Sequence, residues 1–137
     1  MSYQTYYKVE NNNFRETIMK KSFDVEFYEK ENGEVPVKSF LLSLNDKMLA
    51  KIFRIIDVLQ DYGPKVRMPH SKALGDGLFE IRAKQGSDIS RVLYFFYIGK
   101  KVILTNGFVK KTQKTPKGEI ELAKKFREDY LKRYKND

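Results

Sequence analysis

Two short turns that contain glycine divide the middle of the chain into segments of strand length. The first turn is Gly86-Ser87 and the second is Gly99-Lys100. Two-residue turns of this kind favour tight β-hairpins, and the residues around them are rich in the β-branched and aromatic side chains typical of strands. The sequence therefore predicts three consecutive antiparallel strands, at about residues 77–85, 88–98 and 101–108.

Helices are predicted on both sides of these strands. Residues 23–28 alternate as a half-buried strand does, and Pro36 then stands where a short helix begins. Asn45 is placed to cap a longer helix, which Gly63 ends. A last helix is predicted over residues 116–135, where a threonine and a proline mark its start.

The predicted order of elements is β-α-α-β-β-β-α, which defines an α+β fold with a small, mostly antiparallel sheet. Two helices are expected to pack on one face of this sheet, and the C-terminal helix can cover part of the other. Residues 65–76 are predicted to form a polar loop. The domain is expected to span residues 23–137 and to follow a polar N-terminal extension at residues 1–22.

Hydrophobic residues of the three central strands are divided between the two faces of the predicted sheet. One set is predicted to form the helix-covered core: Phe79, Ile81, Ala83, Val92, Tyr94, Phe96 and Ile103. The other set forms an apolar end on the opposite face: Leu78, Leu93, Phe95, Tyr97, Val102 and Leu104. An apolar surface of that size needs a cover, which the C-terminal helix or a partner protein can supply.

The chain carries a strong and uneven positive charge. Its 137 residues include 27 Lys or Arg against 18 Asp or Glu, a formal net charge of +9. Residues 100–137 alone hold 12 Lys or Arg against 5 Asp or Glu. This asymmetry favours a nucleic acid or another phosphate-bearing partner, although a basic surface that serves only solubility is an open alternative.

Several classes of function are excluded by composition. The absence of cysteine rules out disulfides, thiolate metal sites and a thiol nucleophile. The single histidine, His70, cannot form a histidine metal cluster or a two-histidine acid–base pair. No apolar run approaches membrane-spanning length, and the N-terminus lacks the pattern of a signal peptide. We therefore expect a cytoplasmic protein without a metal, a cofactor or a membrane partner.

The first hairpin turn places Arg82 directly opposite Arg91. Directly opposed like charges destabilise a sheet, so the pair is best explained if an anion binds between the two side chains. One alternative stays open, because Glu80 lies diagonal to Arg91 and would partly neutralise the pair.

Further basic, polar and aromatic residues are predicted on or near the same face. Cations around an exposed aromatic ring are typical of single-stranded RNA recognition. This predicted set comprises Lys84, Asn106, Phe108, Lys110, Lys111 and Lys114.

Three stretches of the chain resemble the RelE/HigB-type toxins, and most closely the phage-derived branch of that superfamily. They run from Pro69 to Arg82, from Ser90 to Phe95 and from Asn106 to Pro116. The last stretch contains the element Gly-Phe-Val-Lys-Lys-Thr-Gln-Lys-Thr-Pro, which is fairly specific. The resemblance extends over about residues 23–135 and implies the same small sheet with two helices on one face.

The resemblance also implies a function. Members are toxins of two-gene toxin–antitoxin systems, and many cleave mRNA in the decoding site of the ribosome without a metal ion. A small helix-turn-helix antitoxin neutralises the toxin. The implied activity is therefore that of an endoribonuclease, or mRNA interferase, and the implied partners are mRNA on the ribosome and a cognate antitoxin.

Arginine and lysine side chains stabilise the negative charge that develops on phosphate when the RNA 2′-oxygen attacks it. Two positions depart from the family pattern: Asn106 stands where many relatives have histidine, and the catalytic tyrosine of some relatives has no counterpart. His70 is assigned to the RNA-binding set, although a lone loop histidine is more often a surface or capping residue. By position, four residues match the family's catalytic cations: Arg82, Arg91, Lys110 and Lys111.

Two other functions remain open. The protein can be a non-nucleolytic, ParE-like toxin that acts on a protein target such as gyrase, or a basic RNA-binding module without toxicity. The opposed arginines and the lysines favour the nuclease over the ParE-like toxin, since an inhibitor of a protein target needs no anion site. They do not separate the nuclease from the RNA-binding module.

Overall fold

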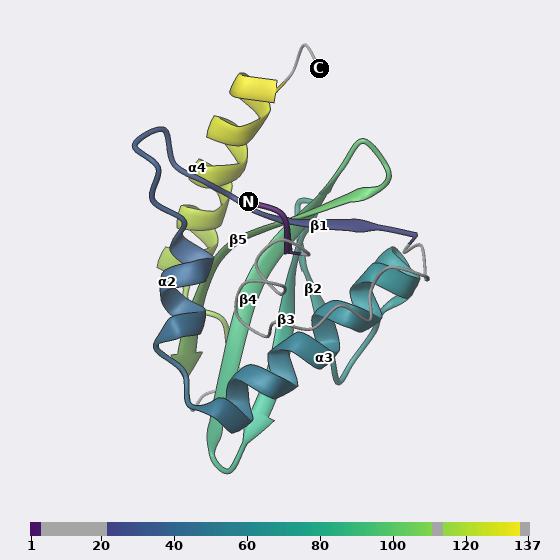
Figure 1. The fold of residues 1–137 in the computed structure, drawn as a ribbon, viewed down its shortest axis with the longest axis vertical. Coiled ribbons are helices and arrows are strands. Elements are labelled where there is room, and N and C mark those ends of the chain that lie inside the picture. The colour runs from purple at the N-terminus through teal and green to yellow at the C-terminus, as the bar shows by residue number, and fades with distance from the viewer. Residues whose placement is uncertain (4–21, 111–113, 135–137) are drawn as a thin grey trace.

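The computed structural model describes residues 1–3, 22–110 and 114–134. It confirms the predicted α+β fold, in which a five-stranded sheet of order β1-β5-β4-β3-β2 has helices on both faces (Figure 1). The strands are β1 (Asp24–Phe27), β2 (Ser71–Gly75), β3 (Leu78–Gln85), β4 (Asp88–Tyr97) and β5 (Lys101–Lys110). The helices are α2 (Pro36–Leu42), α3 (Asp46–Tyr62), the short 3-10 helix η2 (Gly63–Lys65) and α4 (Lys117–Tyr134).

The start of α2 and both ends of α3 lie where the sequence predicts. Pro36 occupies the first turn of α2, and the Asn45 side chain accepts a hydrogen bond of 2.9 Å from the Met48 amide at the start of α3. Gly63 ends α3 with a φ of +50°. Across the described ranges, no helix combines the length and the apolar character that crossing a membrane requires.

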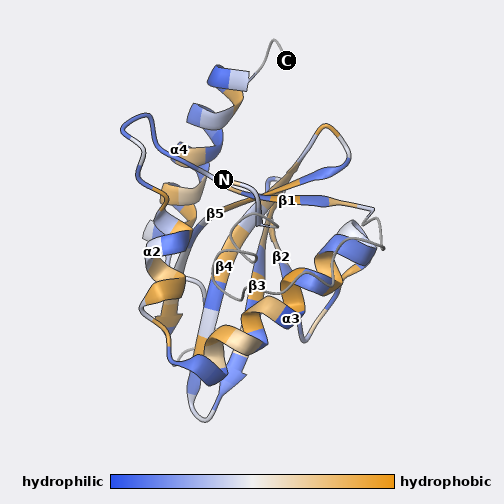
Figure 2. Ribbon diagram, in the orientation of Figure 1, coloured by the Kyte–Doolittle hydropathy of each residue, from blue (hydrophilic) through white to orange (hydrophobic). Residues whose placement is uncertain are grey.

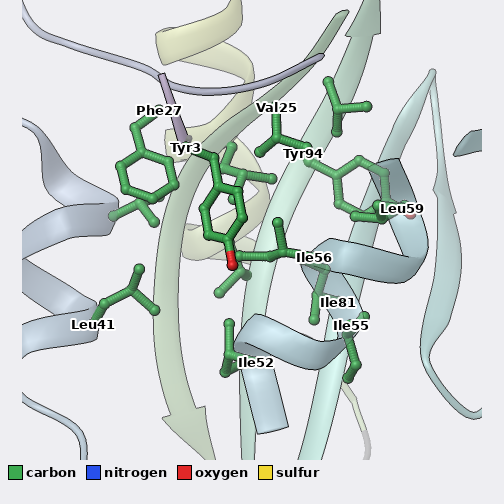
Figure 3. Packing of buried hydrophobic residues seen from close by; sticks show 14 of the residues in the cluster. Tyr3, Val25, Phe27, Leu41, Ile52, Ile55, Ile56, Leu59, Ile81 and Tyr94 are labelled. Carbon is green, nitrogen blue, oxygen red and sulfur yellow. The ribbon is translucent and has the colours of Figure 1, made fainter. Parts of the chain in front are cut away.

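The main hydrophobic core lies between the sheet and the pair α2 and α3. Hydrophobic residues recur along α3 among hydrophilic ones (Figure 2), and the side that carries Ile52, Ile56 and Leu59 is fully buried. Tyr3 also belongs to this core, where it lies between α2 and α3 (Figure 3). Its ring centroid is 5.8 Å from that of Phe53. The N-terminal extension therefore contributes at least one core residue, while residues 4–21 lie outside the described ranges.

The prediction of a polar loop over residues 65–76 is partly wrong, because residues 71–75 form the strand β2. This strand pairs antiparallel with β3, and the two are joined by a tight turn at Asp76-Gly77, with φ values of +54° and +75°. Asp-Gly is one of the strongest local signals for such a hairpin. The polar composition of the segment concealed a strand that lies at the edge of the sheet and is mostly exposed.

The sheet is mixed, because β1 runs parallel to β5 while the other pairs are antiparallel. Local sequence could not show this pairing, since β1 and β5 are separated by most of the domain. The two helices that follow β1 connect it to the rest of the sheet and cover one face of it (Figure 1).

The second predicted hairpin is wrong in register near its turn. The turn contains three residues rather than two, so Tyr97 pairs with Lys101, and β5 then carries an irregularity at Thr105 that restores the predicted register from Asn106 onward. A shift of one residue reverses which face a side chain occupies. The face assignments were therefore wrong for three residues: Val102 and Leu104 lie in the core beneath α2 and α3, whereas Ile103 faces α4.

Replacing Gly107 with Ala should lower the free energy of unfolding by about 1–3 kcal/mol, because a Cβ there overpacks the core. The added atom would lie 2.4 Å from Cδ2 of Phe40, a ring atom on α2. Gly118→Ala is the matched control, since nothing lies within 4 Å of its added Cβ. Denaturant unfolding that shows equal stability for both variants would contradict this packing.

Candidate nucleic-acid interface

The face of the sheet opposite α2 and α3 is apolar at one end and polar at the other. α4 covers the apolar end, where its Ala123, Phe126 and Tyr130 pack with residues of β3, β4 and β5. This cover confirms the role expected for the C-terminal helix. The sheet residues beneath it are Leu78, Leu93, Phe95 and Ile103.

α4 is also held to the sheet by polar contacts along its length. Arg127 donates to the Asp76 carbonyl oxygen at 2.5 Å and forms an ion pair with its carboxylate at 3.0 Å. Further along, the Tyr28 hydroxyl donates to Asp129 at 2.6 Å, and Arg133 pairs with Asp129 at 2.7 Å. Burial and the bond to Asp129 raise the pKa of Tyr28 to about 12. These contacts fix the helix over the apolar end, so the polar end is the part of this face that a ligand can approach.

At the polar end, two rows of side chains cross the sheet. The predicted opposition of Arg82 and Arg91 is confirmed, and Arg91 in turn pairs with Phe108 on β5. The Arg82 amide donates to the His70 carbonyl oxygen at 2.9 Å, so His70 lies at the β2 end of this row. The next row toward the β3–β4 turn contains Lys84, Ile89 and Lys110.

The two arginines lie beneath the surface. Arg91 is 0% exposed and Arg82 is 7% exposed. Glu80, also fully buried, forms an ion pair of 2.5 Å with Arg82 and accepts a hydrogen bond from the Thr115 hydroxyl. This geometry supports the alternative in which Glu80 neutralises part of the charge, because a carboxylate of the protein already lies beside the pair.

Arg91 is surrounded by groups that act on its charge in opposite directions. Burial lowers the pKa of its guanidinium, the charge of Arg82 lowers it further, and Glu80 opposes both. The ring of Phe108 lies against it, with the guanidinium carbon 5.8 Å from the ring centroid. A cation buried in this way contributes a fixed positive potential to the surface above it.

The accessible cations of the interface are lysines. Lys84, Lys110 and Lys114 are exposed, as is His70, and Phe108 is partly exposed. Lys84 also links the sheet to α3, since its carbonyl oxygen accepts a hydrogen bond of 2.6 Å from the Lys51 ammonium. Lys111, predicted as part of the catalytic set, lies outside the described residues.

Asn106 has a structural position rather than a surface one. It is 3% exposed, and its amide nitrogen donates to the backbone oxygen of Glu119 at 3.2 Å and to the side-chain oxygen at 3.1 Å. The residue thereby anchors the first turn of α4 to β5. Among the predicted RNA-binding residues it is the one that the structure places beneath a helix.

Three residues that matter for this interface were not assigned to it from the sequence. The central position of Glu80 follows from the same alternation that places Arg82, so the signal was present. Thr115 was expected only as a helix cap, and its contact with Glu80 arises from tertiary packing. Lys72 pairs with Glu80 across β2 and β3, which could be seen only once β2 was recognised. Within the described ranges, no group of three or more His, Asp or Glu side chains is placed to hold a metal ion.

Comparison with known proteins identifies one related family. The model of a family described as "Phage derived protein Gp49-like (DUF891)" matches residues 39–128, which include α3, the central strands and most of α4. No curated protein matches the chain.

Proposed function

Because the chain belongs to the phage-derived Gp49-like family, a branch of the RelE/ParE toxin superfamily, we propose that it is the toxin of a toxin–antitoxin system. We further propose that it acts by cleaving mRNA on the ribosome. The observation that carries the proposal is the row of His70, Arg82, Arg91 and Phe108, with exposed lysines beside it, on the part of the face that α4 leaves open.

The chemistry of RNA cleavage suits these groups. The 2′-oxygen forms a bond to phosphorus while the bond from phosphorus to the 5′-oxygen breaks, and negative charge develops on the phosphate oxygens. Lys110 is exposed where it can contact this phosphate, and the buried arginines add a positive potential from below. Phe108 offers part of its ring for stacking with a base.

Two protons must move in this reaction, one from the 2′-hydroxyl and one to the 5′-oxygen that leaves. Histidine is the side chain best suited to such transfers near neutral pH. His70 is exposed and lies beside Arg82, so we assign both transfers to it, in place of the histidine that many relatives have at the position of Asn106. Its imidazole takes the proton from the 2′-hydroxyl and, once protonated, gives a proton to the 5′-oxygen that leaves.

Induced expression with primer-extension mapping of cellular mRNAs tests the proposal. We expect growth arrest and discrete cuts in ribosome-bound messages. Arrest without cuts would instead identify a toxin that acts on a protein target, as ParE-like toxins act on gyrase. RNA binding without arrest or cuts would identify a basic RNA-binding module. This third outcome is part of the test because Arg91, one of the proposed catalytic cations, is fully buried.

Lys110→Ala is expected to reduce mRNA cleavage by about tenfold or more, because it removes a cation that contacts the phosphate as charge develops. Binding to single-stranded RNA should also lose about 0.7 from the slope of log affinity against log salt, the value for one phosphate contact. Lys100→Ala is the control, since this lysine lies in the β4–β5 turn at the other end of the sheet. Equal cleavage by both variants would remove Lys110 from the site.

A further inference from the structure

The sheet has an open edge at β2. In the strand order β1-β5-β4-β3-β2, no described strand pairs with the outer side of β2. The edge at β1 differs, because Ser2 forms an antiparallel bridge with Glu26 there. Unpaired edges expose a row of amide and carbonyl groups that another extended chain can join.

The backbone of Ala73 points toward this open side. The His70 carbonyl accepts a bond from Arg82 and therefore faces β3. Because the hydrogen-bonding direction alternates along a strand, Lys72 also faces β3 and Ala73 faces away from it. Ala73 is exposed, so its N–H and C=O are accessible to an added strand.

A groove of about 390 Å³ lies beside this edge, on the same face as α4. Its apolar part comes from Leu74 and Ile120, and its charged part comes from Lys72 and Lys114, both exposed. No acidic side chain lines the described groove. The lining residues are Lys72, Ala73, Leu74, Lys114, Thr115 and Ile120.

We propose that the edge of β2 binds an extended, acidic segment of a protein partner, which adds a sixth strand to the sheet. Main-chain hydrogen bonds to Ala73 supply affinity, as in other cases of strand addition. Alternate side chains of the segment then reach the groove, with an apolar one on Leu74 and Ile120 and carboxylates at the two lysines. RNA is the less suitable occupant, because its backbone has no amide and carbonyl groups in register with a strand.

Such a segment would also inhibit the site. Thr115 lines the groove and donates to Glu80, the residue paired with Arg82, so the bound strand lies next to the buried arginine cluster. Its carboxylates would neutralise Lys72 and Lys114 beside that row. If the proposed function holds, the partner is the antitoxin, and this step of the inference rests on that function.

Binding of a short synthetic peptide to the full-length protein tests the proposal. Its alternate positions carry glutamate, valine and glutamate in turn, with threonine at the positions between, so that carboxylates and an apolar side chain project from the same face of the added strand. Ala73→Pro removes the outward N–H without removing a bond to β3, and it should weaken peptide binding about tenfold, the cost of one to two main-chain hydrogen bonds. Ala73→Val is the matched control, since it keeps the N–H, and it should bind as the wild type does. A peptide N-methylated at alternate amides probes the same bonds on the unaltered protein.

Three results would overturn the inference: no peptide binding by the wild type at low salt, equal binding by Ala73→Pro, or equal binding of the N-methylated peptide. The last two would reduce the interaction to electrostatic attraction. mRNA cleavage by Ala73→Pro reports separately on the proposed function and should match the wild type. Peptide binding that depends on Ala73 in a protein that cleaves no RNA would keep the docking edge and reject the nuclease.

Discussion

Glu80→Ala is expected to lower the free energy of unfolding by about 3–5 kcal/mol, the typical cost of removing one partner from a buried ion pair. Glu80 is fully buried, pairs with Arg82 at 2.5 Å and accepts a bond from Thr115. Without it, two neighbouring buried guanidinium groups would lose the carboxylate beside them. Chemical denaturation of the purified variant measures the effect.

Glu128→Ala is the control for this experiment. Glu128 likewise forms an ion pair, with Lys132, but the distance is 3.8 Å and 73% of the Glu128 side chain is exposed. Exposed pairs of this kind contribute about 0–1 kcal/mol. A loss below about 1 kcal/mol for Glu80→Ala as well would show that its carboxylate does not balance the arginines, and would restore the expectation of an anion site between them.

Arg91→Met is expected to abolish growth arrest and mRNA cleavage while leaving the protein folded. Arg91 is the largest of the fully buried side chains. Methionine fills a similar volume without charge, and Glu80 stays paired with Arg82, so the substitution leaves that carboxylate with its cation. The positive potential beneath the lysines would be lost even though the packing is retained.

The measurement for Arg91→Met combines thermal unfolding with mRNA cleavage, so that loss of function is separated from loss of fold. Arg91→Lys is the companion variant, because it keeps a charge at the same position and should retain part of the activity. A folded Arg91→Met protein that still arrests growth and cuts mRNA would show that the buried arginine has no part in the reaction.

Together these variants distinguish two roles within the buried cluster of Glu80, Arg82 and Arg91. Glu80 is expected to govern stability, because it offsets the charge of groups that the fold has buried. Arg91 is expected to govern activity, because its charge acts on the surface occupied by Lys84, Lys110 and Phe108. The contact of Thr115 with Glu80 connects the cluster to the segment that precedes α4.

Local sequence patterns determined the helices, the first hairpin and the opposition of Arg82 and Arg91. Each depends on residues close together in the chain: Asn45 and Gly63 bound α3, and Gly86-Ser87 sets the register of β3 and β4. The turn at Asp76-Gly77 belongs to the same class, and its signal was present although β2 was expected to be a loop. Register within a hairpin is set by the turn itself, which is why these features can be predicted.

Burial and long-range pairing were decided only by the tertiary structure. The parallel pairing of β1 with β5, the irregularity at Thr105 and the contact of Thr115 with Glu80 all join segments that local patterns treat separately. The same packing places Arg82 and Arg91 beneath the surface and leaves Lys84 and Lys110 accessible. The sequence thus identified the cations and the strand face that holds them. Which of them a ligand can touch depends on what covers that face, a property of the whole fold.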